Sequence, residues 1–276
     1  MKTKGEPRGD KPKASGVRRL LAWAVHLYTA SGLLCAAGIT ALLVQGGDAS
    51  FRWSFVLMVV ATLIDATDGT LARAVRIKEV LPNFDGRRLD DLIDFLNYTC
   101  LPLLLIWRAQ LVPAGWEFVL LLPLLASAYG FCQVSAKTDD GYFLGFPSYW
   151  NLVAFYLYAL QPLSGWLTVA LVVVPALLTF VPSRYLYTTQ RGRLNRVTNL
   201  LAGVWVGLVV WILWRLPDEA LSPASEPGRL TRGLALLSLF FPAFYLAASW
   251  LVTFKVWRRR RRRAEDPFRA ALAAEK

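Results

Sequence analysis

The stretch DATDGTLARAVRIKEVLPNFDGRRLDDLID, residues 65–94, contains six aspartates, and four of them recur at helical spacing in two long apolar segments of the chain. A charged side chain inside a membrane helix costs about 2.5–3.5 kcal/mol on insertion scales. Several such residues close together therefore indicate a chemical task that offsets the cost. Two of the six, Asp85 and Asp91, fall off the helical faces of the other four and are interpreted as solvated or cap residues. The four are Asp65, Asp68, Asp90 and Asp94.

These aspartates recur at the spacing of helical faces. Asp65 and Asp68 are three residues apart, while Gly86, Asp90 and Asp94 follow one another at intervals of four. Each set lies on one face of a helix. If the two faces meet, the carboxylates crowd together and cannot all ionise without cations. Oxygen ligands without histidine or cysteine favour Mg²⁺ or Mn²⁺, and two such ions would suit a diphosphate substrate.

The composition around this stretch is that of a polytopic membrane protein. Of 276 residues, 55% are hydrophobic and 18% are charged, against about a quarter charged in soluble domains. No short alternating segments of a β-barrel are present in the sequence, so an all-α bundle is expected. Seven of eight apolar segments are long enough to cross about 30 Å of hydrocarbon, and 145–160 is marginal. The expected spans are 23–44, 53–73, 89–107, 116–136, 145–160, 164–182, 197–214 and 234–254.

The basic residues predict the orientation of these eight spans. With an even number of spans, 26 of the 31 Lys and Arg fall on the side that holds both tails. The positive-inside rule puts that side, and the 74–88 connector, in the cytoplasm. The expected organisation is a basic tail over 1–19, an eight-helix catalytic domain over 20–256 and an Arg-rich tail over 257–276.

The net charge of +12 does not indicate a nucleic-acid partner. The run of six arginines at 258–263 directly follows an apolar span. In that position a polybasic stretch fixes topology and contacts anionic lipid heads. Membrane lipids are therefore the expected partners of this tail, and nucleic acid is not.

Small residues and one arginine accompany the aspartates. Gly69, Ala72 and Gly86 allow close helix packing, and they also leave space for a nucleotide and its phosphates. Arg73 stands at the expected membrane boundary, where it is either a topology anchor or a phosphate clamp.

The pattern D-x2-D-G-x2-A-R…G-x3-D-x3-D in this stretch resembles the signature of the CDP-alcohol phosphotransferase family. Twelve residues separate Arg73 from Gly86, which is longer than is usual in that family and resembles its bacterial phosphatidylcholine synthase subfamily. The segments AVRIKEVLPNFDG, GFPSYWN and PSRYLY are also similar to that subfamily. The resemblance covers nearly the whole chain.

The resemblance implies a reaction and a set of site residues. A homodimer in the bacterial inner membrane would transfer the phosphatidyl group of CDP-diacylglycerol to choline and release CMP, with its active site facing the cytoplasm. Asp94 would act as the general base as well as a metal ligand. Two divalent cations, Mn²⁺ or Mg²⁺, would be held by Asp65, Asp68, Asp90 and Asp94, and CDP by Gly69, Ala72, Arg73 and Gly86.

Choline requires a site for a quaternary ammonium, which aromatic faces provide. Aromatic residues are also enriched at membrane interfaces, so an anchoring role stays open. Arg184 is either a topology anchor or a contact of the lipid phosphate. The candidate choline contacts lie before and within the fifth expected span and after the sixth: Tyr142, Phe146, Tyr149, Trp150, Tyr185 and Tyr187.

Other functions remain open on sequence alone. Serine, inositol, glycerol phosphate or ethanolamine would be acceptors within the same reaction class, and Arg87, Arg88 and Arg184 keep an anionic acceptor possible. Intramembrane carboxylates are also typical of cation transporters, although the halves show no internal repeat. The single histidine, His26, is interpreted as an interface residue, near enough to the mouth of the site to contact a nucleotide.

Overall fold

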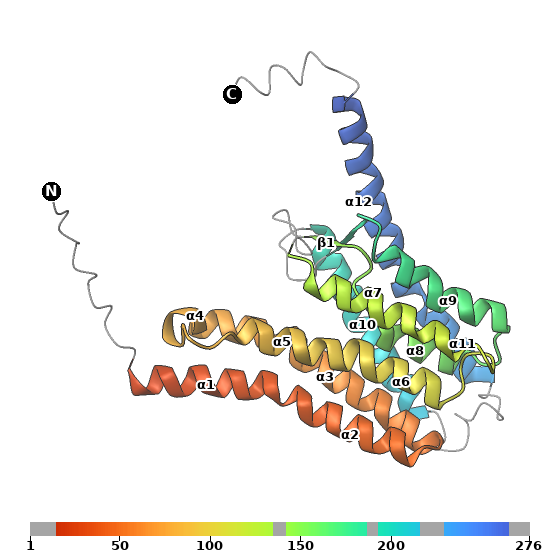
Figure 1. Cartoon of the computed structure of the whole chain (residues 1–276), viewed down its shortest axis with the longest axis horizontal. Helices are drawn as coiled ribbons and strands as arrows, with labels where there is room; N and C mark the ends of the chain where they lie inside the picture. Colours follow the sequence, from red (N-terminus) through yellow and green to blue (C-terminus); the bar gives the residue numbers. More distant parts are fainter. Residues whose placement is uncertain (1–14, 135–141, 187–192, 216–228, 265–276) are drawn as a thin grey trace.

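The computed structural model describes residues 15–134, 142–186, 193–215 and 229–264, and most of these residues are helical (Figure 1). Apolar side chains from most of these helices meet in one large buried cluster. The α-helices are α1 (Gly16–Ala30), α2 (Gly32–Gln45), α3 (Asp48–Val75), α4 (Ile77–Val80), α5 (Gly86–Asp94), α6 (Leu101–Arg108), α7 (Leu121–Cys132), α8 (Trp150–Ala159), α9 (Gly165–Leu178), α10 (Arg193–Arg215), α11 (Arg229–Ser238) and α12 (Phe240–Ala264).

The structure is that of a helical membrane protein. Within the described residues, four helical stretches are long and apolar enough to cross a membrane. Helices α7 and α9 are apolar but shorter. Each of the eight expected spans overlaps a helix, but only the first two and the last two match the four long stretches, so the number eight stays a prediction. The four long stretches are Gly16–Gln45, Asp48–Val75, Asn195–Arg215 and Thr231–Arg259.

The first, second and third of the expected spans form the side of the bundle that carries the aspartates. In Figure 1, the α1–α2 pair, α3 and the α5–α6 pair run along one another, and the beginnings of α1 and α5 lie at the same end as the last turn of α3. The Ser15 hydroxyl accepts the Arg18 N–H and so caps the start of α1. The Asp85 carboxylate caps α5 in the same way by accepting the Arg88 N–H at 3.2 Å.

A π-helical turn, Phe95–Cys100, connects α5 directly to α6. It begins at the residue after Asp94, the last aspartate of the acidic stretch. Such wide turns are rare and often occur at functional sites. Here the wider turn carries Asn97 and Tyr98, both of which contact the neighbouring helices described below.

The connector between α3 and α5 packs on α1. A left-handed backbone at Arg76 ends α3 and starts the short α4. Ile77, Val80 and Leu81 then bury their side chains against Ala22 and Val25 of α1. The long connector therefore has a small core of its own, which positions the start of α5.

Among the described residues, a short two-stranded ribbon departs from an all-α fold. The strands β1 (Tyr142–Leu144) and β2 (Arg184–Leu186) pair antiparallel, with Tyr142 opposite Leu186. Each has only three residues, too few for a sequence pattern to indicate. This ribbon joins the segment before α8 to the segment after α9, and β2 packs along α12 through hydrogen bonds from its backbone to Ser249 and Thr253.

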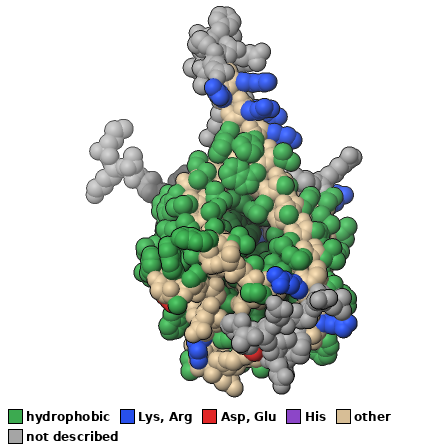
Figure 2. Space-filling model, turned by 90° about the vertical axis from the view of Figure 1, so that its right-hand side faces the viewer, with side chains coloured by type: hydrophobic (Ala, Val, Ile, Leu, Met, Phe, Trp, Pro, Cys, Tyr) green, Lys and Arg blue, Asp and Glu red, His purple; other side chains and the backbone are tan. Residues whose placement is uncertain are grey.

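Helix α12 extends beyond the rest of the bundle (Figure 1). It continues past residue 257, the expected start of the C-terminal tail, and ends at Ala264. Trp250, Phe254 and Trp257 form an aromatic cluster just before the arginine run. Figure 2 shows Lys and Arg side chains along the projecting end and hydrophobic side chains over much of the face below it.

Candidate active site

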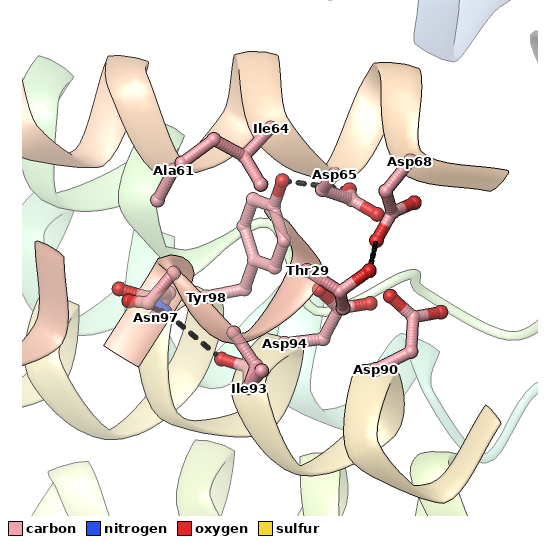
Figure 3. Close-up of a pocket in the computed structure, with 11 residues that line it drawn as sticks. Thr29, Ala61, Ile64, Asp65, Asp68, Asp90, Ile93, Asp94, Asn97 and Tyr98 are labelled. Atoms are coloured by element: carbon pink, nitrogen blue, oxygen red, sulfur yellow. Dashed lines mark hydrogen bonds between the residues drawn. The ribbon is translucent and has the colours of Figure 1, made fainter. Parts of the chain in front are cut away.

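A polar pocket lies where α1, α3, α5 and the π-helical turn meet (Figure 3). Asp65 and Asp68 reach into it from α3, and Asp90 and Asp94 reach into it from α5. All four aspartates of the acidic stretch are therefore brought together, as their helical spacing predicts. The pocket is lined by Thr29, Gly32, Ala61, Ile64, Asp65, Asp68, Asp90, Ile93, Asp94, Asn97 and Tyr98.

Three of the carboxylates are close enough to share a cation. Asp65, Asp68 and Asp90 each offer an oxygen, and these three oxygens lie within 4.8 Å of one another. Asp68 is buried, with 6% of its surface exposed. A donor set made of oxygens alone fits a hard divalent cation. Asp94 lines the same pocket but stands outside this group of three.

Two hydroxyl groups donate hydrogen bonds to the carboxylates. Thr29 of α1 donates to Oδ2 of Asp68 at 2.8 Å, and Tyr98 of the π-helical turn donates to Oδ2 of Asp65 at 2.8 Å (Figure 3). Asn97 donates to the Gly32 carbonyl at 3.2 Å and thereby links the same turn to α2. The pocket thus draws residues from α1, α2, α3, α5 and the π-helical turn, and sequence reasoning identified the contributions of α3 and α5 alone.

The residues expected to bind CDP are not among those that line this pocket, and they differ in what they contact. The Arg73 guanidinium folds back onto its own helix, where it donates to the Thr70 hydroxyl at 3.0 Å and lies over Gly69. Ala72 instead packs against the cluster between α1 and α4. Its small side chain therefore serves close packing of the connector in this structure.

His26 fills the space beside Gly86. A Cβ atom on Gly86 would overlap the His26 imidazole ring. That ring is 6% exposed and packs against Phe84 and Trp23, with ring centroids 4.4 and 5.9 Å away. Gly86 therefore allows α5 to approach α1. His26 is a buried contact between these elements, whereas the sequence analysis interpreted it as an interface residue.

Four of the described aromatic residues proposed for choline gather in one cluster, and the Trp150 ring contacts one of them, Phe146, with centroids 5.5 Å apart. Phe146, Tyr149 and Tyr185 pack with Tyr245 of α12, a member that sequence reasoning missed. Trp150 is fully buried and donates its indole N–H to Ser127 at 2.8 Å. That contact favours a packing role for Trp150.

The ribbon brings two further candidates together. The Arg184 guanidinium lies over the Tyr142 ring, 5.5 Å from its centroid. These residues come from separate strands and were proposed for different parts of the substrates. Tyr187 lies outside the described residues.

The start of α8 lies beside the acidic pocket. The Asn151 amide donates to the Thr62 hydroxyl of α3 at 3.4 Å. Thr62 is three residues before Asp65, so this contact is one turn from the carboxylates. The GFPSYWN segment, which ends at Asn151, therefore runs from the aromatic cluster to the neighbourhood of the pocket.

Thr29 and Tyr98, which donate hydrogen bonds to the pocket's carboxylates, were not selected by the sequence analysis. Tyr98 lies four residues after Asp94 and continues the spacing of the aspartates, so that spacing was a usable signal. Thr29 has no comparable signal because its partner is 39 residues away. Asp85 and Asp91 were interpreted as cap or solvated residues; Asp85 caps α5 and Asp91 pairs with Arg87 at 3.8 Å.

The chain was compared with known proteins. No protein-family model matches it. It is 30% identical over 243 residues to the phosphatidylcholine synthase of Borreliella burgdorferi, covering 87% of this chain and 97% of the relative. It is 36% identical to that of Pseudomonas aeruginosa, covering 69% and 79%, and 32% identical to that of Rhizobium johnstonii, covering 80% and 92%. The chain belongs to the phosphatidylcholine synthase family.

Proposed function

We propose that this protein is an enzyme that transfers the phosphatidyl group of CDP-diacylglycerol to choline, giving phosphatidylcholine and CMP. The observation that carries the proposal is the cluster of Asp65, Asp68 and Asp90 in a helical membrane protein whose relatives are named phosphatidylcholine synthase. Divalent cations held by such a cluster would neutralise the diphosphate of a CDP-linked donor, a task that a simple cation carrier does not have.

The reaction requires a base and a charge-neutralising site. Asp94 accepts the hydroxyl proton of choline while the choline oxygen forms a bond to the β-phosphorus and the bond from that phosphorus to CMP breaks. Asp65, Asp68 and Asp90, together with Asp94, would hold two divalent cations, Mn²⁺ or Mg²⁺. Bound cations neutralise the diphosphate and polarise its oxygens. The protein otherwise acts by positioning both substrates.

The remaining site residues orient the two substrates. Gly69, Ala72, Arg73 and Gly86 border the CDP, with Arg73 contacting a phosphate. Phe146 and Tyr149, together with Tyr142 and Tyr187, provide aromatic faces for the trimethylammonium of choline. The link from Asn151 to Thr62 supports this placement, because it joins the aromatic segment to α3 one turn before Asp65. Arg184 contacts the lipid phosphate.

The proposed setting is the inner membrane of a bacterium, with both tails and the active site facing the cytoplasm. Eight helices over 20–256 form the catalytic domain between the tails over 1–19 and 257–276, and two copies form a homodimer. The distribution of Lys and Arg supports this orientation. The start of α1, the end of α3 and the start of α5 lie at one end of the bundle, as this orientation requires (Figure 1).

Headgroup transfer in detergent micelles tests the proposal. Purified protein is given CDP-diacylglycerol, Mn²⁺ or Mg²⁺ and labelled choline, with Asp94→Asn in parallel. We expect lipid-linked choline and CMP in equal amounts, both reduced about 10²–10⁴-fold in the variant because the base is lost. A product formed with serine, inositol or glycerol phosphate but not with choline would contradict the acceptor. Choline flux into vesicles without any product would instead favour a transporter.

A further inference from the structure

Helix α1 supplies a hydrogen-bond donor to Asp68, the most buried of the three clustered carboxylates Asp65, Asp68 and Asp90. Thr29 is 8% exposed and Asp68 is 6% exposed, so this contact is shielded from solvent. The Thr29 hydroxyl lies 2.8 Å from Oδ2 of Asp68 and 3.4 Å from the Val25 carbonyl of its own helix. Its single proton is therefore best directed at the carboxylate, since that contact is the shorter of the two.

The π-helical turn supplies a second donor to the same pocket-facing side of α3. The Tyr98 hydroxyl reaches Oδ2 of Asp65 at 2.8 Å. Asp65 and Asp68 are three residues apart on the face of α3 that looks into the pocket (Figure 3). Each thus receives a hydroxyl from a different helix, so the rotation of each carboxylate is fixed from outside α3.

We infer that Thr29 and Tyr98 are positioning residues, which turn the carboxylates of Asp68 and Asp65 toward the space shared with Asp90. The inference rests on the proposed function in taking that space as the site of a divalent cation. Carboxylates that ligate metals are commonly held by such outer hydrogen bonds, and loss of the outer partner weakens metal binding or activity about 10–100-fold.

A purely structural role predicts a different result. If the hydroxyls only compensate for the burial of two carboxylates, their removal would destabilise the metal-free fold and leave the affinity for cations unchanged. If they position the carboxylates, their removal would weaken cation binding, and high cation concentrations would restore most of the turnover.

Binding of Mn²⁺ alone to the purified full-length protein tests the inference. The free ion is followed by its electron paramagnetic resonance signal, with no lipid substrate present. For Thr29→Val, which keeps the shape of the side chain and removes the hydroxyl, we expect an affinity about 10–100-fold weaker than that of the unmodified protein. Thr29→Ser retains a hydroxyl, so its affinity for Mn²⁺ should stay within a few-fold of that of the unmodified protein. The same holds for the control variant Thr168→Val.

Thr168→Val is the matched control. Thr168 is 3% exposed, and its hydroxyl bonds to the Ser164 carbonyl near the start of its own helix, α9. The same chemical change is thus made at a buried threonine that does not line the pocket. Tyr98→Phe provides an independent second variant that removes one oxygen near Asp65, and it should weaken Mn²⁺ binding in the same way.

Three results would overturn the inference. The first is unchanged Mn²⁺ affinity in both Thr29→Val and Tyr98→Phe. The second is equal loss in Thr29→Ser and Thr29→Val, and the third is equal loss in Thr168→Val. Because the titration uses no choline or CDP-diacylglycerol, it stands apart from the proposed reaction: an unmodified protein that binds Mn²⁺ but forms no lipid-linked choline would contradict the function and leave the positioning role intact.

Discussion

Asp90 and Asp91 are neighbours in the sequence with different surroundings. Asp90 offers an oxygen to the carboxylate cluster that it forms with Asp65 and Asp68. Asp91 instead pairs with Arg87 on the outer side of α5. We expect Asp90→Asn to abolish Mn²⁺ binding and to lower transfer at least about 10-fold, since a ligand to the cation is lost. Asp91→Asn should leave both unchanged. Equal effects of the two variants, measured by Mn²⁺ titration and headgroup transfer, would contradict this division.

Gly86 was considered both for close helix packing and for nucleotide binding. Its contact with His26 allows these two roles to be tested separately. Gly86→Ala forces a methyl group into the imidazole ring, and we expect a loss of about 1–3 kcal/mol in the free energy of unfolding. In a His26→Ala background the same change should cost little, because the ring is gone. Thermal unfolding in detergent measures both. Gly203→Ala is the control, since nothing lies within 4 Å of its added Cβ.

Activity of the double variant then reports on the nucleotide. If Gly86 serves packing alone, His26→Ala with Gly86→Ala transfers as well as His26→Ala alone. If the nucleotide must approach Gly86, the double variant folds but loses transfer. A cost of Gly86→Ala that persists without the ring would contradict the packing account.

At the scale of elements, the GFPSYWN segment depends on one glycine. Gly145 has φ +81°, and a Cβ there would overlap the Thr179 carbonyl at the end of α9. Its N–H donates to the Ser183 carbonyl at 2.9 Å, next to the ribbon. A left-handed backbone alone costs about 1–2 kcal/mol, and we expect Gly145→Ala to destabilise the protein by more than that amount.

Gly115→Ala provides the comparison for that prediction. Gly115 has a similar φ of +82°, but nothing lies within 4 Å of its added Cβ. The difference in unfolding free energy between the two variants measures the overlap with Thr179 by itself. Equal costs would mean that the segment before α8 does not depend on close contact with α9.

Sequence reasoning reached the helices and the aspartates because both are encoded locally. Apolar runs indicate spans, and intervals of three and four place Asp65 and Asp68 on one face and Asp90 and Asp94 on another. The ribbon, the π-helical turn and the role of α1 depend on partners far along the chain. Thr29 and Asp68 are 39 residues apart, and Tyr98 and Asp65 are 33 apart. No local period relates such pairs.

For the whole molecule, the testable quantity is its orientation. The positive-inside rule places Lys78 of the connector in the cytoplasm and Ala114, between α6 and α7, on the opposite side. Both residues are exposed. In a variant without its native cysteines, we expect Ala114→Cys to react with a membrane-impermeant maleimide in spheroplasts. Lys78→Cys should react only after permeabilisation. The reverse pattern, read by gel shift, would invert the proposed topology.

The two hydroxyl donors differ in when they are synthesised relative to the α3 carboxylates that they contact. A ribosome delivers Thr29 before Asp68, so the donor for Asp68 is already made when that carboxylate emerges. Tyr98 is delivered 33 residues after Asp65. At about 5–20 residues per second, Asp65 waits a few seconds for its donor. Nascent chains stalled before residue 98 cannot form the hydrogen bond from Tyr98 to Asp65, whereas chains stalled far enough beyond it for Tyr98 to leave the ribosome can.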